Sequence, residues 1–338
     1  MATGEIPPAG YPSSTETYPW HDRLWLMLAP QIDRLPHALL LHGRPGLGKQ
    51  SFAFRLAQVF LCTNDQGGAA CGECRGCQWF TAGTHPDLIF ITQMEETKSI
   101  TIDQIRELGD FLSLKPHTAK HKVVIISPAE AMNLNAANSL LKLLEEPPPG
   151  SILLLVTSHP AHLPVTIRSR CSHLRFTPPD RQVGLHWMRA RHSGEAPLEN
   201  LLEMAGGSPL LAESLVRDGF VQSRAALLQD MESLYFGHED PVTCAARWKR
   251  LGMKPCLNWL YGFVADLIKV EMGAPASSLT NPTVVSNTTH QNYKYKISVL
   301  YNLIDTIHEY QRHISGPLDE LMVLEDVLIS WARMRRLQ

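Results

Sequence analysis

Apolar residues in the first half of the chain gather in short uninterrupted runs. The clearest runs, at 38–42, 122–126 and 151–157, have the length of a strand. Runs without alternation are typical of parallel strands, because the helices that connect such strands cover both faces of the sheet. The segment after the first run, 51–60, has the three-and-four spacing of a helix. The pattern therefore predicts an α/β core, in which a parallel sheet has helices on both faces.

A different pattern begins after FTPPD at 176–180, where two prolines interrupt regular structure. A short helix is expected at 198–205, and apolar positions keep three-and-four spacing at 297–314 and 318–334. The polar span 276–292 lacks this spacing and is predicted to be a surface loop. Helical spacing alone fits both a bundle that closes its own core and a collar that joins subunits. The predicted division is a core at 1–177, a small helical lid at 178–219 and an all-α domain at 220–338.

Length and charge narrow the class of protein. A chain of 338 residues is long enough for more than one hydrophobic core. The formal net charge of −2 argues against a protein that coats nucleic acid through its overall charge, although it is compatible with a local basic face. No apolar run approaches the roughly 18 residues of a membrane span, and the N-terminus lacks the basic start and apolar core of a secretory signal. We therefore expect a soluble cytoplasmic protein with no membrane contact and a loose arm before Trp20.

A glycine-rich loop, HGRPGLGKQS at 42–51, joins the first predicted strand to the first predicted helix. Gly43, Gly46 and Gly48 can adopt backbone angles that are closed to other residues, and the loop amides and helix N-terminus favour a bound phosphate. Lys49 would reach the terminal phosphates of a nucleotide. The sequence therefore predicts a phosphate-binding loop, with a simple glycine-rich turn as the alternative.

Two parts of a hydrolytic site are missing around this loop. The pattern G-x-x-x-x-G-K-S/T has Gln50 at its last position, and Ser51 lies about 100° further around the helix, so the hydroxyl that would hold magnesium is displaced. The second predicted strand ends in Ser127 and Pro128 instead of an acidic pair, and Glu130 is expected within the next helix. We therefore expect no intrinsic ATPase activity. Whether ATP or ADP binds without turnover stays open.

Four of the seven cysteines lie close together, at Cys62, Cys71, Cys74 and Cys77. The short spacings between the last three are typical of tetrahedral zinc sites. A disulfide pair is the alternative, but a cytosolic compartment keeps thiols reduced. His85 is a conceivable substitute ligand, which four cysteines make unnecessary. Because four thiolates close the coordination sphere, the zinc is predicted to be structural and not catalytic.

Two further motifs carry a resemblance to a known family. The run NSLLKLLEEPP at 138–148 and the run IRSRC at 167–171 resemble the clamp-loader AAA+ proteins of bacterial DNA polymerase III. The resemblance is close and specific as far as about residue 215. Beyond that residue it rests only on the length and the helical character of the remaining chain. In this family the ATPase subunits carry an acidic pair where this chain has Ser127 and Pro128, and a basic second sensor where it has GSPL at 207–210. Both departures point to a subunit that does not hydrolyse ATP.

The resemblance also singles out Arg170. In this family the matching arginine projects into the ATP site of the neighbouring subunit, and a planar guanidinium suits a phosphate. An ordinary surface or salt-bridging arginine is the alternative, and this is what we expect of Arg168. Glu145 and Glu146 are expected to form the solvated end of a helix at 138–146 that stops before Pro147. The strand end at Ser158 matches the position of the family's first sensor.

Together these patterns predict an AAA+ core with a zinc module, a helical lid and an all-α collar. The resemblance implies a rigid, stator-like subunit of a pentameric clamp loader, which would present Arg170 to the ATP of an adjacent subunit. Its partners would be the ATPase subunits and the clamp-opening delta subunit, and through the assembly the sliding clamp and primed DNA. The alternatives are an ATP-hydrolysing subunit that uses Gln50 and Ser51 in an unusual metal site, and an independent zinc-containing DNA-binding protein.

Overall fold

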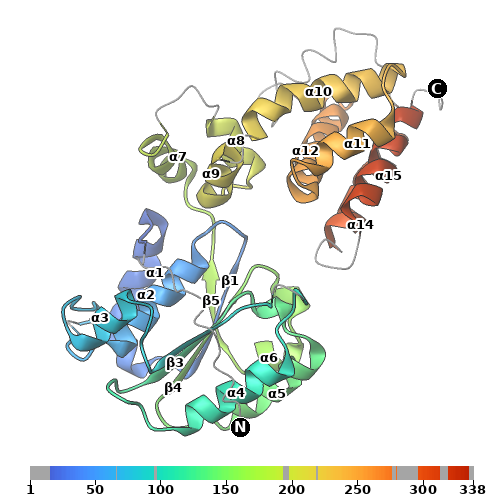
Figure 1. The fold of residues 1–338 in the computed structure, drawn as a ribbon. Helices are drawn as coiled ribbons and strands as arrows, with labels where there is room; N and C mark the ends of the chain where they lie inside the picture. The colour runs from blue at the N-terminus through green and yellow to red at the C-terminus, as the bar shows by residue number, and fades with distance from the viewer. Residues whose placement is uncertain are drawn as a thin grey trace. The chain divides into compact units, whose positions relative to one another are not determined.

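The chain divides between Pro179 and Asp180 into two compact units (Figure 1). No helix in the described part of the chain is long and apolar enough to cross a lipid bilayer. The computed structural model describes residues 16–65, 67–94, 97–192, 198–217, 220–275, 279, 296–312 and 319–334.

The first unit is built on a parallel sheet. Within the described residues the sheet has five strands, in the order β2 (Leu88–Ile91), β3 (Lys122–Ile126), β4 (Ser151–Thr157), β1 (Ala38–Gly43) and β5 (Ser172–Phe176). All neighbouring strands are parallel, and Leu40 of β1 lies opposite Leu155 on one side and His173 on the other. The prediction of a parallel sheet is confirmed, and the three apolar runs are its β1, β3 and β4.

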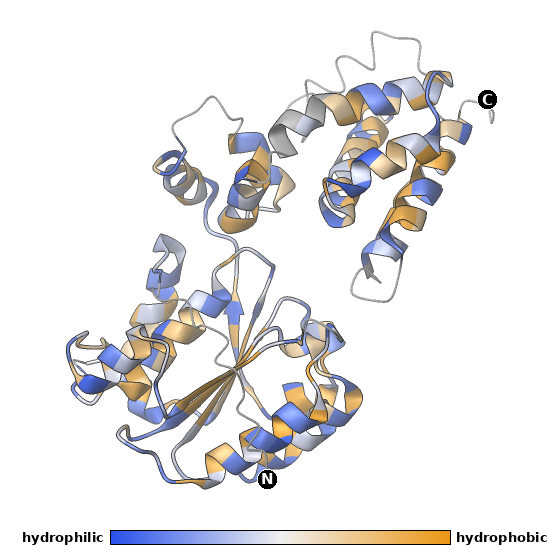
Figure 2. Cartoon of the chain, in the orientation of Figure 1, coloured by the Kyte–Doolittle hydropathy of each residue, from blue (hydrophilic) through white to orange (hydrophobic). Residues whose placement is uncertain are grey.

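Helices cover both faces of this sheet. They are α1 (Asp22–Leu28), α2 (Lys49–Leu61), α3 (Arg75–Thr81), α4 (Ile102–Ser113), α5 (Leu134–Glu145) and α6 (Val165–Arg168), with short 3-10 helices η1 (Pro19–His21), η2 (Ala29–Arg34), η3 (Ala129–Ala131) and η4 (Pro160–His162). Leu39 and Leu41 belong to one core, with α1 and α2, whereas Leu40 belongs to a second core, with α4 and α5. Successive residues of β3 and β4 and the apolar residues of β1 are therefore all buried, which explains why these three runs do not alternate. Figure 2 shows the hydrophobic colour along the central strands.

The helix that follows β3 begins earlier than the sequence pattern indicated. The pattern places this helix at 138–146, but α5 starts at Leu134 because the Asn133 side chain caps it and accepts a hydrogen bond from the Ala136 amide at 2.8 Å. Glu130, which was expected within the next helix after β3, lies in the short 3-10 helix η3, before the cap of α5. The Glu130 side chain lies near the end of β4, where its Oε1 accepts a hydrogen bond from the Ser158 amide at 3.0 Å.

The second unit is helical, as its spacing predicted. Its helices are α7 (Arg181–Arg189), α8 (Leu198–Met204), α9 (Pro209–Arg217), α10 (Phe220–Phe236), α11 (Pro241–Lys249), α12 (Met253–Glu271), α14 (Ile297–Arg312) and α15 (Glu320–Arg333). Buried aromatic rings form part of its core: the ring centroids of Trp248 and Trp259 are 5.7 Å apart, and those of Phe263 and Trp331 are 5.6 Å apart.

Some predicted segments fall outside the described residues. The loop predicted at 276–292 does so except for Leu279, and the helix expected to reach residue 314 is described as far as Arg312. The boundary between the two compact units lies close to the predicted end of the core. The separation of a lid from a collar at residue 219 stays a prediction.

Candidate functional site

The glycine-rich loop leads from the end of β1 into α2. Gly48 precedes the first helical residue with φ 74°, in the left-handed region that favours glycine. A Cβ atom at this position would lie 2.5 Å from the Tyr18 ring, so glycine is also required for space. The strand, loop and helix that the sequence predicted are therefore present.

The residues just before α1 pack over this loop. Trp20 Nε1 donates a hydrogen bond to the Leu47 carbonyl at 3.0 Å, and His21 Nε2 donates to the same oxygen at 2.7 Å. The Tyr18 ring is buried and stacks on the Trp20 ring, with centroids 5.0 Å apart. No sequence motif pointed to these side chains, whose only signal is a short aromatic run, Tyr18 to His21. These three side chains of the N-terminal segment pack against the glycine-rich loop and hold its backbone in place.

Lys49 is buried and already has partners within the chain. Its Nζ donates to the Arg44 carbonyl at 2.7 Å and to the Ser158 hydroxyl at 3.0 Å. Burial lowers the pKa of Lys49 to about 8, although the nearby Glu130 carboxylate opposes this shift. The lysine of the loop and the strand end at Ser158 thus meet, a contact that the sequence did not reveal. A bound phosphate would have to replace part of this hydrogen bonding.

Gln50 and Ser127 stand where a hydrolytic site needs ligands for magnesium. The Ser127 hydroxyl donates a hydrogen bond to Gln50 Oε1 at 3.2 Å, so the two side chains pair with each other. Neither side chain ionises in this setting, and the next acidic residue along the chain, Glu130, lies in η3. Ser51 follows within α2. The arrangement can cradle a phosphate with backbone amides and a lysine, but it provides poor ligands for magnesium.

The four clustered cysteines come together after α2. Their sulfur atoms all lie within 4.8 Å of one another. The Sγ atoms of Cys62 and Cys71 are 3.5 Å apart, and those of Cys62 and Cys74 are 3.8 Å apart. Tetrahedral zinc with Zn–S bonds near 2.3 Å would place its sulfurs about 3.8 Å apart, so the spacing fits. Cys62, Cys71, Cys74 and Cys77 could therefore hold a metal ion.

Local hydrogen bonds favour a thiolate at Cys74, whereas burial raises the pKa of Cys62 and of Cys77. The Cys77 amide donates to Cys74 Sγ at 3.4 Å, and the Cys71 amide donates to Cys62 Sγ at 3.4 Å. Burial alone would raise the pKa of Cys74, but hydrogen bonds from Thr63 and Cys77 outweigh it and lower the pKa to about 5. The His85 ring uses one of its two nitrogens, since Nδ1 accepts a hydrogen bond from the Asp87 amide at 3.0 Å, while the buried Nε2 has no hydrogen-bond partner within the described residues.

Arg170 lies just beyond α6 and is partly exposed. Its Nε donates to Glu145 Oε1 at 2.8 Å, Nη2 lies 2.5 Å from the same oxygen, and Nη1 donates to the Thr166 carbonyl at 3.0 Å. Its side chain keeps 36% of its surface exposed. Glu145 is a half-exposed helix end, as expected, but the pattern did not reveal its pairing with an arginine 25 residues away. Arg168 is more enclosed, and its Nε has no partner within the described residues.

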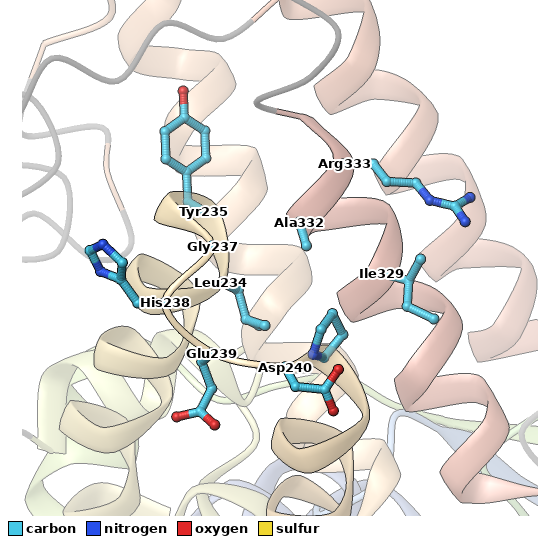
Figure 3. A pocket seen from close by; sticks show the side chains of 10 residues that line it. Leu234, Tyr235, Gly237, His238, Glu239, Asp240, Ile329, Ala332 and Arg333 are labelled. Atoms are coloured by element: carbon cyan, nitrogen blue, oxygen red, sulfur yellow. The ribbon is translucent and has the colours of Figure 1, made fainter.

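A cavity of about 740 Å³ lies in the second unit, beside the turn after α10 and the last turn of α15 (Figure 3). Its lining is partly apolar, with Leu234 and Ile329, and its acidic residues Glu239 and Asp240 are engaged within the fold. Asp240 accepts the Thr243 amide at 3.0 Å and so caps α11, and Glu239 lies 3.6 Å from Arg247. No sequence motif indicated a site at this position.

Two family models match the chain. One, described as DNA polymerase III, delta subunit, matches residues 23–180, and the other, described as DNA polymerase III, delta subunit, C terminal, matches residues 218–333. A DNA polymerase III subunit delta' from Pseudomonas aeruginosa is 32% identical over 324 residues, covering 94% of this chain and 98% of the relative.

Two further relatives extend the comparison. A DNA polymerase III subunit delta' from Escherichia coli is 30% identical over 318 residues, covering 92% of this chain and 94% of the relative. A DNA polymerase III subunit tau/gamma from Haemophilus influenzae is 36% identical over 169 residues, which is 50% of this chain and 24% of that protein. Similarity to the delta' proteins thus spans both units, whereas the reported match to tau/gamma covers half of the chain.

Proposed function

The chain belongs to the family of DNA polymerase III delta' subunits, and we propose that it acts in a clamp loader as a subunit that does not hydrolyse ATP. The observation that carries this proposal is the hydrogen bond between Gln50 and Ser127, the two residues that stand at the positions of magnesium-binding residues. Transfer of a phosphoryl group needs a metal ion held by oxygen ligands and a polarised water. This pair offers an amide and a hydroxyl that satisfy each other. The loop can therefore position phosphate without activating it.

The subunit's contribution to ATP hydrolysis would be Arg170, supplied to the ATP of a neighbouring subunit. A permanently charged guanidinium stabilises the charge that develops on the transferred phosphoryl group. The partial exposure of Arg170 at the surface of the first unit supports this role. The similarity to the tau/gamma protein supports a neighbour with the same kind of core. The further partners in this proposal are the delta subunit, the sliding clamp and primed DNA, engaged through the assembly.

A structural zinc ion completes the proposal. Cys62, Cys71, Cys74 and Cys77 would hold it, and as four thiolates they leave no open position for chemistry. When bound, the ion would cross-link the end of α2 to the start of α3, since Cys62 follows α2 and Cys74 caps α3. The rigidity of this segment suits a subunit whose role is mechanical.

The intact Lys49 favours a second candidate, an ATP-hydrolysing subunit with an unusual metal site. Turnover by the purified chain separates the two. We expect the unmodified chain to hydrolyse ATP no faster than the Lys49→Ala variant. A fluorescent ATP analogue, titrated into the unmodified chain with and without magnesium, should bind with the same affinity in both cases. Magnesium-dependent turnover that Lys49→Ala abolishes would instead establish the second candidate.

A further inference from the structure

The guanidinium of Arg170 is held by its own subunit on two sides. The edge that carries Nε and Nη2 faces Glu145 Oε1, at 2.8 Å and 2.5 Å, and Nη1 reaches the Thr166 carbonyl at 3.0 Å. An arginine side chain has five N–H donors in a rigid planar fork. Three of them are accounted for by these contacts, and the other two belong to the terminal nitrogens Nη1 and Nη2.

We propose that Glu145 is the positioning residue for Arg170, fixing the guanidinium so that its terminal nitrogens face a phosphate of the neighbouring subunit. The inference rests on the proposed function, because it concerns the arginine that acts there in trans. Glu145 is the last residue of α5, so its own backbone is set by the helix and by the helix break before Pro147. A helix end is a firmer support for a long side chain than a loop would be.

The value of the contact lies in orientation more than in folding stability. Both side chains are partly exposed, at 36% for Arg170 and 50% for Glu145, and ion pairs of this kind stabilise a fold little. An arginine that is already oriented, however, needs less reorganisation when charge develops on the phosphate. The contact resembles the ion pair of protein kinases, in which a carboxylate orients the lysine that contacts ATP phosphates. Removing Glu145 would leave Arg170 present but free to adopt other rotamers.

A double-mutant cycle in the reconstituted loader, with sliding clamp and primed DNA, tests this role. Arg170→Ala should slow hydrolysis at the adjacent site by about a thousandfold or more. Glu145→Ala should lower kcat there by about tenfold, with an unchanged KM for ATP, because only orientation is lost. Glu145→Gln keeps an accepting oxygen and should recover part of the rate. The double variant should be no slower than Arg170→Ala alone, because Glu145 acts through Arg170.

Glu146→Ala is the matched control, since it removes the adjacent exposed carboxylate, which makes no ion pair within the described residues, and it should leave kcat unchanged. Equal unfolding midpoints of the variants would show that the fold is intact. If Glu145→Ala leaves kcat unchanged or raises it, or if its effect persists in the double variant, the positioning role is overturned while the proposed function stands. If Arg170→Ala itself has no effect, both are overturned.

Discussion

His21 joins the N-terminal segment to the phosphate loop through one buried ring. Its side chain is 1% exposed, its Nε2 donates to the Leu47 carbonyl, and its ring meets those of Phe52 and Phe176 edge to face. Burial is the main cause that lowers the pKa of His21 to about 4. The ring is therefore neutral at pH 7, and protonating it in the folded chain is unfavourable.

The effect of pH on stability follows from this shift. Because the pKa is lower in the folded chain than in the unfolded chain, the contribution of His21 is present above pH 6.5 and is lost as pH falls towards 4. His21→Gln keeps an N–H donor for Leu47 but does not titrate. Between pH 7 and pH 5 the free energy of unfolding of the unmodified chain should fall by about 2 kcal/mol more than that of the variant. Urea unfolding at the two pH values measures this, and equal losses would contradict the assignment.

Single residues of the phosphate loop were predictable from sequence, but their contacts were not. The departures at Gln50 and Ser127 show in local motifs, because each motif fixes the residue type at a given spacing. Their mutual hydrogen bond joins residues 77 positions apart in the sequence. The two residues meet because β1 and β3 are parallel strands of one sheet, separated by β4 alone, and their C-terminal ends lie on the same side of that sheet. The same holds for Arg170 and Glu145. Pairing of this kind depends on tertiary packing, which no local pattern encodes.

At the scale of elements, the cysteine segment depends most on a ligand. The helix that follows Cys74, α3, is short, and helices of this length are marginal without tertiary support. The four sulfurs already have the spacing of a tetrahedral site. A metal ion would therefore contribute much of the order of this segment.

Metal removal tests this dependence. The chain purified under reducing conditions should contain one zinc per molecule. Cys74→Ser should lose this zinc, because three thiolates bind the metal less tightly than four, and a strong chelator should remove it from the unmodified chain. In both cases hydrogen exchange in α3 should increase. Cys171→Ser, a buried cysteine outside the cluster, serves as the control and should keep its zinc. A zinc content well below one per chain would exclude the structural metal.

The elements themselves were largely predictable, and their boundaries less so. Buried strands such as β3 and β4 are uninterrupted apolar runs, so their limits coincide with the sequence pattern. The start of α5 was placed four residues late, because the amphipathic pattern is clear only from Asn138 and the cap at Asn133 is a weaker local signal. Prolines marked the helix ends more reliably, as at Pro147.

At the scale of the whole molecule, the α/β core is followed by a unit made of helices. Membership of the delta' family was indicated by motifs in the first half of the chain and is established by relatives that match over nearly all of it. Helical spacing could not decide whether the last helices form a collar, because a closed bundle and an interface bury the same kind of apolar stripe. That decision depends on the other subunits of the assembly.

The most direct test of the central claim measures ATP hydrolysis by the reconstituted loader in a single turnover. One assembly would contain Arg170→Ala, and a control would contain Arg106→Ala, which removes an exposed arginine that pairs within its own helix. If this subunit supplies Arg170 in trans, the first assembly should hydrolyse the adjacent ATP at least about a thousandfold more slowly than a loader with the unmodified subunit. The control assembly should hydrolyse it at the unmodified rate. Unchanged hydrolysis with Arg170→Ala would contradict the proposed function.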